Sequence, residues 1–281
     1  MRPRVALTVG DPRGIGPEIV AKLLADPPAG AEYVVIGEGT TPRSALPNDA
    51  GLAVKSQVET AVRMALAGEV HAIVTGPAEK HALHVAGVRY PGHTEWLAAL
   101  AGVTDVAMML TDERLRVVLV TTHLPLRDVP TAVTEERVRR VGGITRDALR
   151  AWWGIAEPRL AVCALNPHAG EQGLFGSEDQ DVLAPAARAL GAAGPLPADT
   201  VFVRALRGEF DAVLAPYHDV GMTAIKVAAF GRAANVTLGL PFVRTAPDHG
   251  TAFDIAGRGI ADPGSLRAAV ELAVKLAGRR P

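Results

Sequence analysis

The sequence predicts an α/β protein with a largely parallel sheet, and three observations favour this class. Short apolar runs rich in Val, Leu and Ile alternate along the chain with longer amphipathic stretches. Most of the short runs end at Gly, Pro, Asp or Asn, as strands do at turns. Hydrophobic residues make up 48% and charged residues 21% of the 281 residues, which are globular values and exclude intrinsic disorder. Such alternation is typical of helices covering both faces of a parallel sheet.

The strand candidates are short β-branched or aliphatic segments. In chain order they are Val5–Val9, Tyr33–Gly37, Ala72–Thr75, Val106–Leu110, Val117–Thr121, Leu160–Ala164, Ala212–Leu214 and Asn235–Leu238. Their length, three to five residues, suits strands rather than helices.

Three helices are predicted from caps and apolar periodicity. Pro17–Leu24 places a proline in its first turn, where the missing N–H costs little. Gln57–Ala67 carries an apolar stripe at helical spacing. Ser265 is expected to be the N-cap of a final helix. Between strands and helices, Gly39–Ala53 is rich in small residues and proline, and we expect a mobile or trimmed loop there.

Charge and hydropathy exclude several classes of protein. The net charge is −1 and no basic patch is visible, so nucleic-acid binding is not expected. No apolar run approaches the roughly 18 residues that span a bilayer, and the first apolar run is too short for a signal peptide. A soluble, cytoplasmic protein without a membrane partner is therefore expected. The single cysteine, Cys163, excludes an intramolecular disulfide, and its apolar neighbours predict a small core residue.

Three histidines, His123, His168 and His218, each follow a predicted strand. The carboxyl ends of strands are where α/β proteins place their sites. Imidazoles bind Zn, Co, Ni or Fe, and three of them leave coordination positions open for substrate oxygens. A lone histidine can equally cap a strand or bond to a backbone carbonyl. Because His93 and His249 also lie in polar loops, spacing alone leaves open which three of the five bind a metal.

Glycine-rich loops and cations form a second group of candidates. Gly10–Glu18 joins a strand to a helix but lacks the full spacing of the dinucleotide fingerprint, so a tight turn explains its glycines equally well. Asp254–Gly259 is a similar backbone-exposing stretch. Lys226, Arg232 and Arg244 suit a phosphate or carboxylate. Arg232 is expected to be solvated, whereas Arg244 lies between apolar segments and is expected to have a bound partner.

Eight segments occur together in a recognisable order. They are Gly10–Glu18, Thr75–Pro77, Gly92–Glu95, Thr122–Arg127, Leu165–Glu171, Tyr217–Asp219, Asn235–Pro241 and Asp248–Ala252. Together they resemble the 4-hydroxythreonine-4-phosphate dehydrogenase family of vitamin B6 (pyridoxal phosphate) synthesis. The resemblance runs from about residue 4 to about residue 277. That family is similar, in turn, to the isocitrate and isopropylmalate dehydrogenases.

The resemblance implies a two-domain isocitrate/isopropylmalate dehydrogenase-like fold, with three α/β/α layers and a cleft between the domains. Residues 1–92 plus 237–281 would form the NAD-binding domain, and residues 93–236 the metal, substrate and dimerisation domain. It also implies a homodimer whose active site lies at the subunit interface, where both chains contribute.

The resemblance assigns site residues by motif. The metal ligands fall on His123, His168 and His218. Substrate contacts fall on His93, Thr94, Lys226, Asn235 and Arg244. Cofactor contacts fall on His249, Gly250, Thr251, Ala252 and Asp254, with the first four at the NAD adenosine and Asp254 at its ribose hydroxyls. A carboxylate at that hydroxyl favours NAD over NADP, because it would repel the extra phosphate.

The reaction implied is NAD-dependent oxidation of 4-phosphohydroxy-L-threonine, a small phosphorylated hydroxy-amino acid, followed by decarboxylation to 3-amino-2-oxopropyl phosphate. One divalent metal per site (Zn, Co, Mn or Mg) would assist. Asp219 and Lys226 are the catalytic candidates: Asp219 as proton acceptor or as the group that orients His218, and Lys226 with Arg244 for the substrate's negative charges.

Three departures from the family pattern keep alternatives open, and the first is a segment between Thr40 and Gln57 that is shorter than in typical members. Val220 follows Asp219 where the family commonly has Gln, and Glu79 places an acid beside Lys80. The alternatives are the same chemistry on D-threonate or D-erythronate 4-phosphate, or a non-catalytic protein that binds a phosphorylated metabolite.

Overall fold

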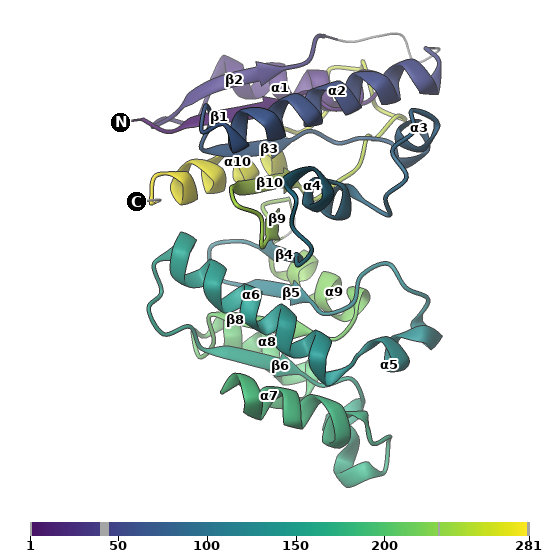
Figure 1. Cartoon of the computed structure of the whole chain (residues 1–281), viewed down its shortest axis with the longest axis vertical. Coiled ribbons are helices and arrows are strands. Elements are labelled where there is room, and N and C mark those ends of the chain that lie inside the picture. Colours follow the sequence, from purple (N-terminus) through teal and green to yellow (C-terminus); the bar gives the residue numbers. More distant parts are fainter. Residues whose placement is uncertain (1, 40–44, 230, 280–281) are drawn as a thin grey trace. The chain divides into compact units, whose positions relative to one another are not determined.

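The computed structural model describes residues 2–39, 45–229 and 231–279 (Figure 1). The chain divides into two compact units: unit 1 comprises Met1–Thr104 and Gly231–Pro281, and unit 2 comprises Asp105–Phe230. Each unit has a sheet with helices on both faces, so the predicted α/β class is confirmed.

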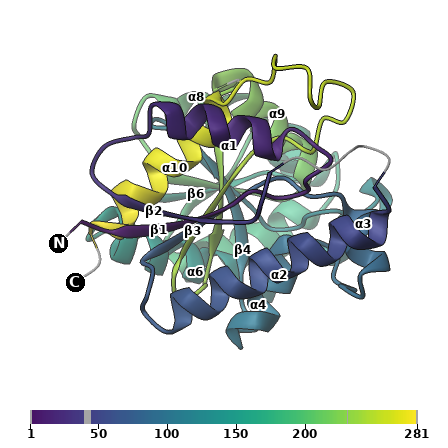
Figure 2. The ribbon, with the colours of Figure 1, turned by 90° about the horizontal axis from the view of Figure 1, so that it is seen from above.

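Unit 1 contains a sheet of strand order β2-β1-β3-β10-β9, in which only β9 is antiparallel to its neighbour β10. Helices α1 and α10 cover one face of this sheet, and α2 and α4 cover the other (Figure 2). The elements of unit 1 are β1 (Arg4–Thr8), α1 (Gly16–Ala25), β2 (Glu32–Ile36), α2 (Pro47–Leu66), β3 (Ala72–Thr75), α3 (Lys80–Val85), α4 (His93–Ala101), β9 (Ala234–Leu238), β10 (Val243–Pro247) and α10 (Gly264–Ala277).

Unit 2 has the strand order β4-β5-β8-β6-β7, antiparallel between β4 and β5 and parallel elsewhere. Helix α6 lies on one face and helices α8 and α9 on the other (Figure 1). The elements of unit 2 are β4 (Ala107–Thr111), β5 (Arg116–Leu119), η1 (Leu126–Asp128), α5 (Val129–Ala132), α6 (Glu135–Trp153), β6 (Leu160–Cys163), η2 (Pro167–Gly173), η3 (Asp179–Leu183), α7 (Ala184–Leu190), β7 (Ala193–Leu196), α8 (Ala198–Leu206), β8 (Ala212–Ala215) and α9 (His218–Ala229).

Helix α6 shows how local sequence sets an element. The Thr134 side chain accepts a hydrogen bond from the Arg137 amide at 3.2 Å, which satisfies one of the unpaired donors of the first turn. Glu135 and Glu136 place negative charge at the positive end of the helix dipole. Gly154 ends the helix with φ +70°, a left-handed conformation that costs glycine little.

All eight predicted strands form, with small shifts at their ends, and the structure adds β7 and β10. β7 was missed because Gly194 and Pro195 lie inside it, and both residues disfavour strands. β10 was missed because Arg244 interrupts its apolar pattern. Cys163 is fully buried in β6, and burial raises the pKa of its thiol to about 12, which confirms it as a core residue.

Two local expectations were wrong. Helix α2 starts at Pro47 rather than Gln57, so the second half of the Gly39–Ala53 segment is helical, while residues 40–44 lie outside the described residues. Proline at the first helical position is compatible with that start. Ser265 lies inside α10, whose N-cap residue is Pro263. Its hydroxyl bonds instead to the Asp248 carboxylate at 2.8 Å, which ties the helix to the segment after β10.

The division into units differs from the predicted domain boundaries in two segments. Residues 93–104 and 231–236 belong to unit 1. The antiparallel pairing of β9 with β10, which places Val236 opposite Thr245, holds the second segment there. Helix α4 packs against α2, which holds the first. The assignment of NAD binding and metal binding to separate domains stays a prediction. Among the described residues, no helix has the length and apolar character needed to cross a membrane.

Candidate functional site

The structure brings His123 and His218 together at one end of the unit 2 sheet. β5 and β8 are parallel neighbours with Leu119 opposite Ala215, so the loops that follow them start side by side. Thr121 then donates a hydrogen bond from Oγ1 to the Pro216 carbonyl at 2.7 Å and fixes the two loops to each other. As a result the centroids of the His123 and His218 rings lie 5.4 Å apart, although the residues are far apart in sequence. Two of the three predicted metal ligands are therefore neighbours.

The carboxylate of Asp219 is placed to orient the ring of His218. His218 is the first residue of α9, and its Nδ1 lies 2.7 Å from Oδ1 of the next residue, Asp219. A carboxylate that accepts from Nδ1–H leaves the lone pair on Nε2, which is the atom then able to bind a metal. The Asp219 side chain is 86% exposed. This geometry favours the orienting role over proton acceptance.

His168 lies in the loop that follows β6, in the short helix η2. The loop starts at Leu165 and Asn166, whose amides donate to the buried Asp179 carboxylate at 2.8 and 3.0 Å. His168 has φ +53°, within a left-handed turn, and its ring lies 6.5 Å from that of Phe175. Within the described residues, no three His, Cys, Asp or Glu side chains are grouped so that they could hold a metal. A single chain thus assembles two of the predicted ligands and not the third.

Arg244 is a buried cation without an acidic partner in the described part of the chain. It is 4% exposed, inside β10. Its Nη1 donates to Thr237 Oγ1 at 3.0 Å and its Nη2 to Thr75 Oγ1 at 2.5 Å, while its Nε is buried without a partner. Burial lowers its pKa to about 10, so the guanidinium stays charged at neutral pH. An uncompensated buried charge is costly, which makes Arg244 a candidate for binding an anion.

Unpaired buried polar atoms concentrate on the predicted binding residues. Of five such atoms among the described residues, four belong to His93, Asn235, Arg244 and His249, and the fifth to Arg116. Burial, followed by the charges of Arg244 and Lys80, lowers the pKa of His93 to about 3. Its imidazole is therefore neutral and able both to donate and to accept a hydrogen bond. Polar groups prepared in this way are typical of a ligand site. Thr94 follows His93 in the first turn of α4.

The predicted cofactor residues lie on the segment after β10, which packs against the glycine loop after β1. The Ile15 amide donates to the Thr251 carbonyl at 2.9 Å. A Cβ on Gly14 would lie 2.8 Å from that carbonyl, so the approach requires glycine. Asp254 is exposed and bonds to no described residue, and Nε2 of His249 is buried without a partner. This segment, which also carries Gly250 and Ala252, offers a carboxylate and an imidazole nitrogen to a ligand.

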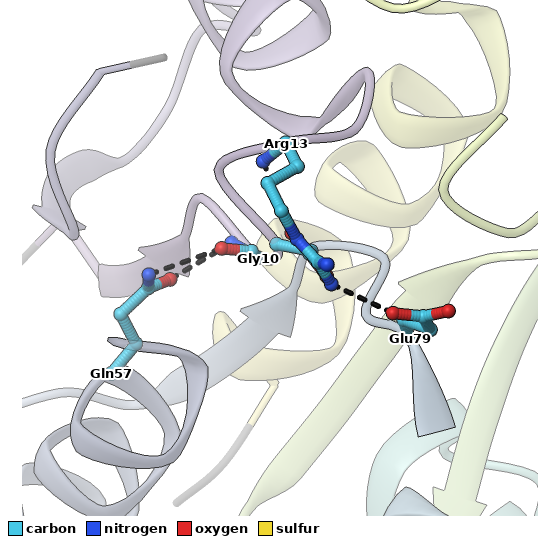
Figure 3. A network of polar contacts seen from close by, with 5 residues as sticks. Gly10, Arg13, Gln57 and Glu79 are labelled. Atoms are coloured by element: carbon cyan, nitrogen blue, oxygen red, sulfur yellow. Dashed lines mark hydrogen bonds and ion pairs between the residues drawn. The ribbon is translucent and has the colours of Figure 1, made fainter. Parts of the chain in front are cut away.

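A network centred on Arg13 was not predicted from the sequence (Figure 3). Its guanidinium donates to both oxygens of buried Asp11, at 3.0 and 2.7 Å, and to Oε2 of Glu79 at 2.7 Å. Gln57 holds the same loop by bonding to the amide and carbonyl of Gly10 at 2.8 and 3.1 Å. Arg13 also lies 5.3 Å over the Phe253 ring. The sequence signal that could have revealed it is a cation, Arg13, inside the glycine-rich turn Gly10–Glu18.

Comparison with known proteins identifies the family. A family model described as pyridoxal phosphate biosynthetic protein PdxA matches residues 26–273. The chain belongs to this PdxA family. The 4-hydroxythreonine-4-phosphate dehydrogenase of Caulobacter vibrioides is 43% identical, over 98% of this chain and 98% of that protein. The family resemblance expected from the motifs is confirmed.

Solved structures agree with the PdxA assignment. The crystal structure of 4-hydroxythreonine-4-phosphate dehydrogenase from Klebsiella pneumoniae matches with a TM-score of 0.88 and 39% identity, covering 98% of this chain and 99% of that one. Isocitrate dehydrogenase from Methylococcus capsulatus matches at 16% identity with a TM-score of 0.52, covering 98% of this chain and 86% of that one. At that identity the likeness shows the fold alone, and it confirms the predicted isocitrate dehydrogenase-like fold.

Proposed function

We propose that this chain is an NAD-dependent 4-hydroxythreonine-4-phosphate dehydrogenase. It oxidises 4-phosphohydroxy-L-threonine and releases CO2 to give 3-amino-2-oxopropyl phosphate, in pyridoxal 5'-phosphate synthesis. The observation that carries the proposal is the guanidinium of Arg244, which is buried in unit 1 and has no acidic partner among the described residues. A substrate with a phosphate and a carboxylate supplies a negatively charged partner for this guanidinium.

His93 and Asn235 supply the neutral part of substrate recognition. The neutral imidazole of His93 donates to or accepts from a substrate hydroxyl or oxyanion, depending on its tautomer. The buried Oδ1 of Asn235 accepts from a substrate donor such as the ammonium group. Thr94 and Lys226 are the remaining proposed substrate contacts, and Lys226 would balance negative charge on the substrate.

His123 and His218 fit a divalent metal. Their rings are neighbours, and the Asp219 carboxylate fixes the His218 ring with Nε2 as the donor atom. A bound metal would favour deprotonation of the substrate hydroxyl and then polarise the new carbonyl, which promotes loss of CO2. Among Zn, Co, Mn and Mg, an imidazole donor set favours Zn or Co, because Mg prefers oxygen ligands.

The third ligand, His168, is proposed to come from a second copy of the chain. Large apolar side chains are exposed next to the predicted ligands: Leu124 and Leu126 follow His123, and Leu174 and Phe175 follow His168. Exposed apolar groups around polar site residues are typical of an interface. A homodimer would bury them and would complete the three-histidine set, so that both chains contribute to each active site.

The segment after β10 is proposed to hold NAD. His249, Gly250, Thr251 and Ala252 would contact the adenosine, and the free carboxylate of Asp254 would accept from the ribose hydroxyls. NAD supplies the hydride acceptor of the reaction. Arg13 holds this segment in place through Phe253, and the Ile15 amide holds it through Thr251.

The experiment is NADH absorbance on mixing the protein with NAD, 4-phosphohydroxy-L-threonine and Zn, Mn, Co or Mg in parallel. A metal-dependent rise that EDTA suppresses is the expected result. A rise only with D-threonate or D-erythronate 4-phosphate would overturn the substrate and keep the reaction class. Phosphate binding without NAD or metal binding would overturn the proposal in favour of a non-catalytic binding protein.

A further inference from the structure

A cavity of about 310 Å³ lies within unit 1 between helices α3 and α4. We name it the α3–α4 cavity. The polar groups in its lining are Lys80, His81, His84, Tyr90 and the predicted substrate ligand His93. Among the described residues, one ammonium and three imidazoles line it, and no carboxylate does. This lining suits an anion rather than a cation or a neutral apolar ligand.

Lys80 supplies the ammonium group in the lining of this cavity. It is the exposed first residue of α3 and makes no hydrogen bond or ion pair with any described residue. It lies close enough to His93 for its charge to act on that imidazole, as does the charge of Arg244. Both cations lack a carboxylate partner in the described part of the chain. His93 is therefore flanked by two positive groups that no described residue of unit 1 neutralises.

The nearest acid in sequence is prevented from neutralising Lys80. Glu79 precedes it, but Oε2 of Glu79 lies 2.7 Å from Nη2 of Arg13 (Figure 3). Arg13 is itself fixed, because it is 8% exposed and chelates the fully buried Asp11. The other acid nearby, Glu95, lies against Gly92 at the start of α4 and is not part of the cavity lining. The ammonium of Lys80 is thus left for a ligand.

We propose that Lys80 is a further substrate-binding residue, which holds a second oxyanion group of the substrate at the α3–α4 cavity while Arg244 holds the first. Arg13 is the corresponding positioning residue, because it binds Glu79 and keeps Lys80 available. The proposal rests on the proposed function, since that substrate carries two oxyanions, a phosphate and a carboxylate. It adds a contact that discriminates against substrates with only one of them.

The test uses inorganic phosphate as the probe and does not need turnover. Thermal unfolding of the wild type, Lys80→Met and Lys275→Met is followed against phosphate concentration at constant ionic strength. Lys275 is a matched control, because it is an exposed helix lysine without a partner among the described residues. We expect Lys80→Met to need about tenfold more phosphate for the same shift, the size of one charge-assisted contact, and Lys275→Met to match the wild type. Equal phosphate response in Lys80→Met and the wild type overturns the proposal.

Turnover separates this proposal from the proposed function. In the NADH assay, Lys80→Met should raise KM for the phosphorylated substrate about tenfold and change kcat by less than about threefold. A wild type that responds to phosphate through Lys80 but never produces NADH would overturn the proposed function alone. A wild type that turns over with an unchanged KM in Lys80→Met would overturn the role of Lys80 alone.

The positioning role of Arg13 is tested by rescue. Arg13→Met releases Glu79, which can then pair with Lys80, so the phosphate response should weaken. Adding Glu79→Gln should restore the response, because the neutral amide no longer competes for the ammonium. Arg13→Met also leaves Asp11 buried without its partner and lowers stability, but Glu79→Gln cannot repair that loss. Failure of Glu79→Gln to restore phosphate binding in folded protein would overturn this role.

Discussion

Nδ1 of His218 lies 2.7 Å from Oδ1 of Asp219 in the first turn of α9. The contact joins two adjacent residues, so it forms as soon as the helix starts and does not depend on distant packing. If His218 binds a metal as proposed, this contact makes Asp219 the group that orients the ligand without being a ligand itself.

We predict that Asp219→Ala lowers metal affinity about 10–100-fold, the usual effect of losing the partner of a ligand imidazole. The measurement is competition for Zn against a chromophoric chelator, with Asp181→Ala, an exposed acid on η3, as the control. Unchanged affinity together with lost turnover and an altered pH–rate profile would instead assign proton acceptance to Asp219.

A complementation prediction follows because no third ligand joins His123 and His218 within the described part of the chain. His123→Ala and His168→Ala should each be inactive and still folded. If each site takes His123 from one chain and His168 from its partner, a mixed dimer has one intact site. Random mixing of the two variants should then restore about a quarter of the wild-type activity. The measurement is NADH formation after the mixture is unfolded and refolded together. A mixture as inactive as either variant would show that one chain supplies all three histidines.

The sequence predicted eight of the ten strands and the residues of the candidate site, and the reason is visible in β5 and β8. Their aliphatic runs are unambiguous, and His123 and His218 follow directly where parallel strands end. The pairing of these strands was not predictable, because register is set by packing and not by local pattern. The 5.4 Å separation of the two rings follows from that register.

Contacts that depend on tertiary structure could not be predicted from the sequence. Glu79 was noticed only as an acid beside Lys80, whereas in the structure its partner is Arg13, which is distant in sequence. Ser265 had the features of an N-cap, but its hydroxyl bonds to Asp248 instead. Local hydrogen-bonding preferences are weak, about 1 kcal/mol, so a buried tertiary partner overrides them.

The exposed carboxylate of Asp254 predicts the cofactor preference. Asp254→Asn should reduce the ratio of kcat/KM for NAD over NADP by about tenfold, because the repulsion of the 2'-phosphate is removed. Initial rates with both cofactors measure this ratio, and Asp199→Asn on α8 of unit 2 is the control. An unchanged ratio would place the ribose away from Asp254.

The lowered pKa of His93 leads to a prediction of how the stability of the protein changes with pH. The pKa of His93 is about 3 in the folded protein, below the ordinary value of about 6.5 that applies to the unfolded chain. Between these values the unfolded state binds a proton that the folded state does not, so the wild type loses stability as pH falls, by up to roughly 1.4 kcal/mol per pH unit from this group. His93→Asn should lose less than the wild type between pH 6.5 and 4.5, as measured by urea unfolding in EDTA. Parallel losses in both proteins would contradict a buried neutral imidazole.

The burial of Arg244 leads us to predict that replacing it preserves the stability of the fold and weakens substrate binding. Replacing it with methionine removes a buried charge that has only hydroxyl partners among the described residues. Replacing buried ionic groups by apolar ones of similar volume is often neutral or stabilising. In the absence of ligands, the free energy of unfolding of Arg244→Met should therefore be higher than that of the wild type, or lower by no more than about 1 kcal/mol.

The same variant should lose at least about 100-fold in kcat/KM, because the substrate oxyanion loses its charge-assisted bonds. Urea unfolding and NADH initial rates measure the two effects. A loss of more than about 3 kcal/mol in stability would show that Arg244 is held for the fold, and that its two threonine contacts outweigh the cost of burying the charge.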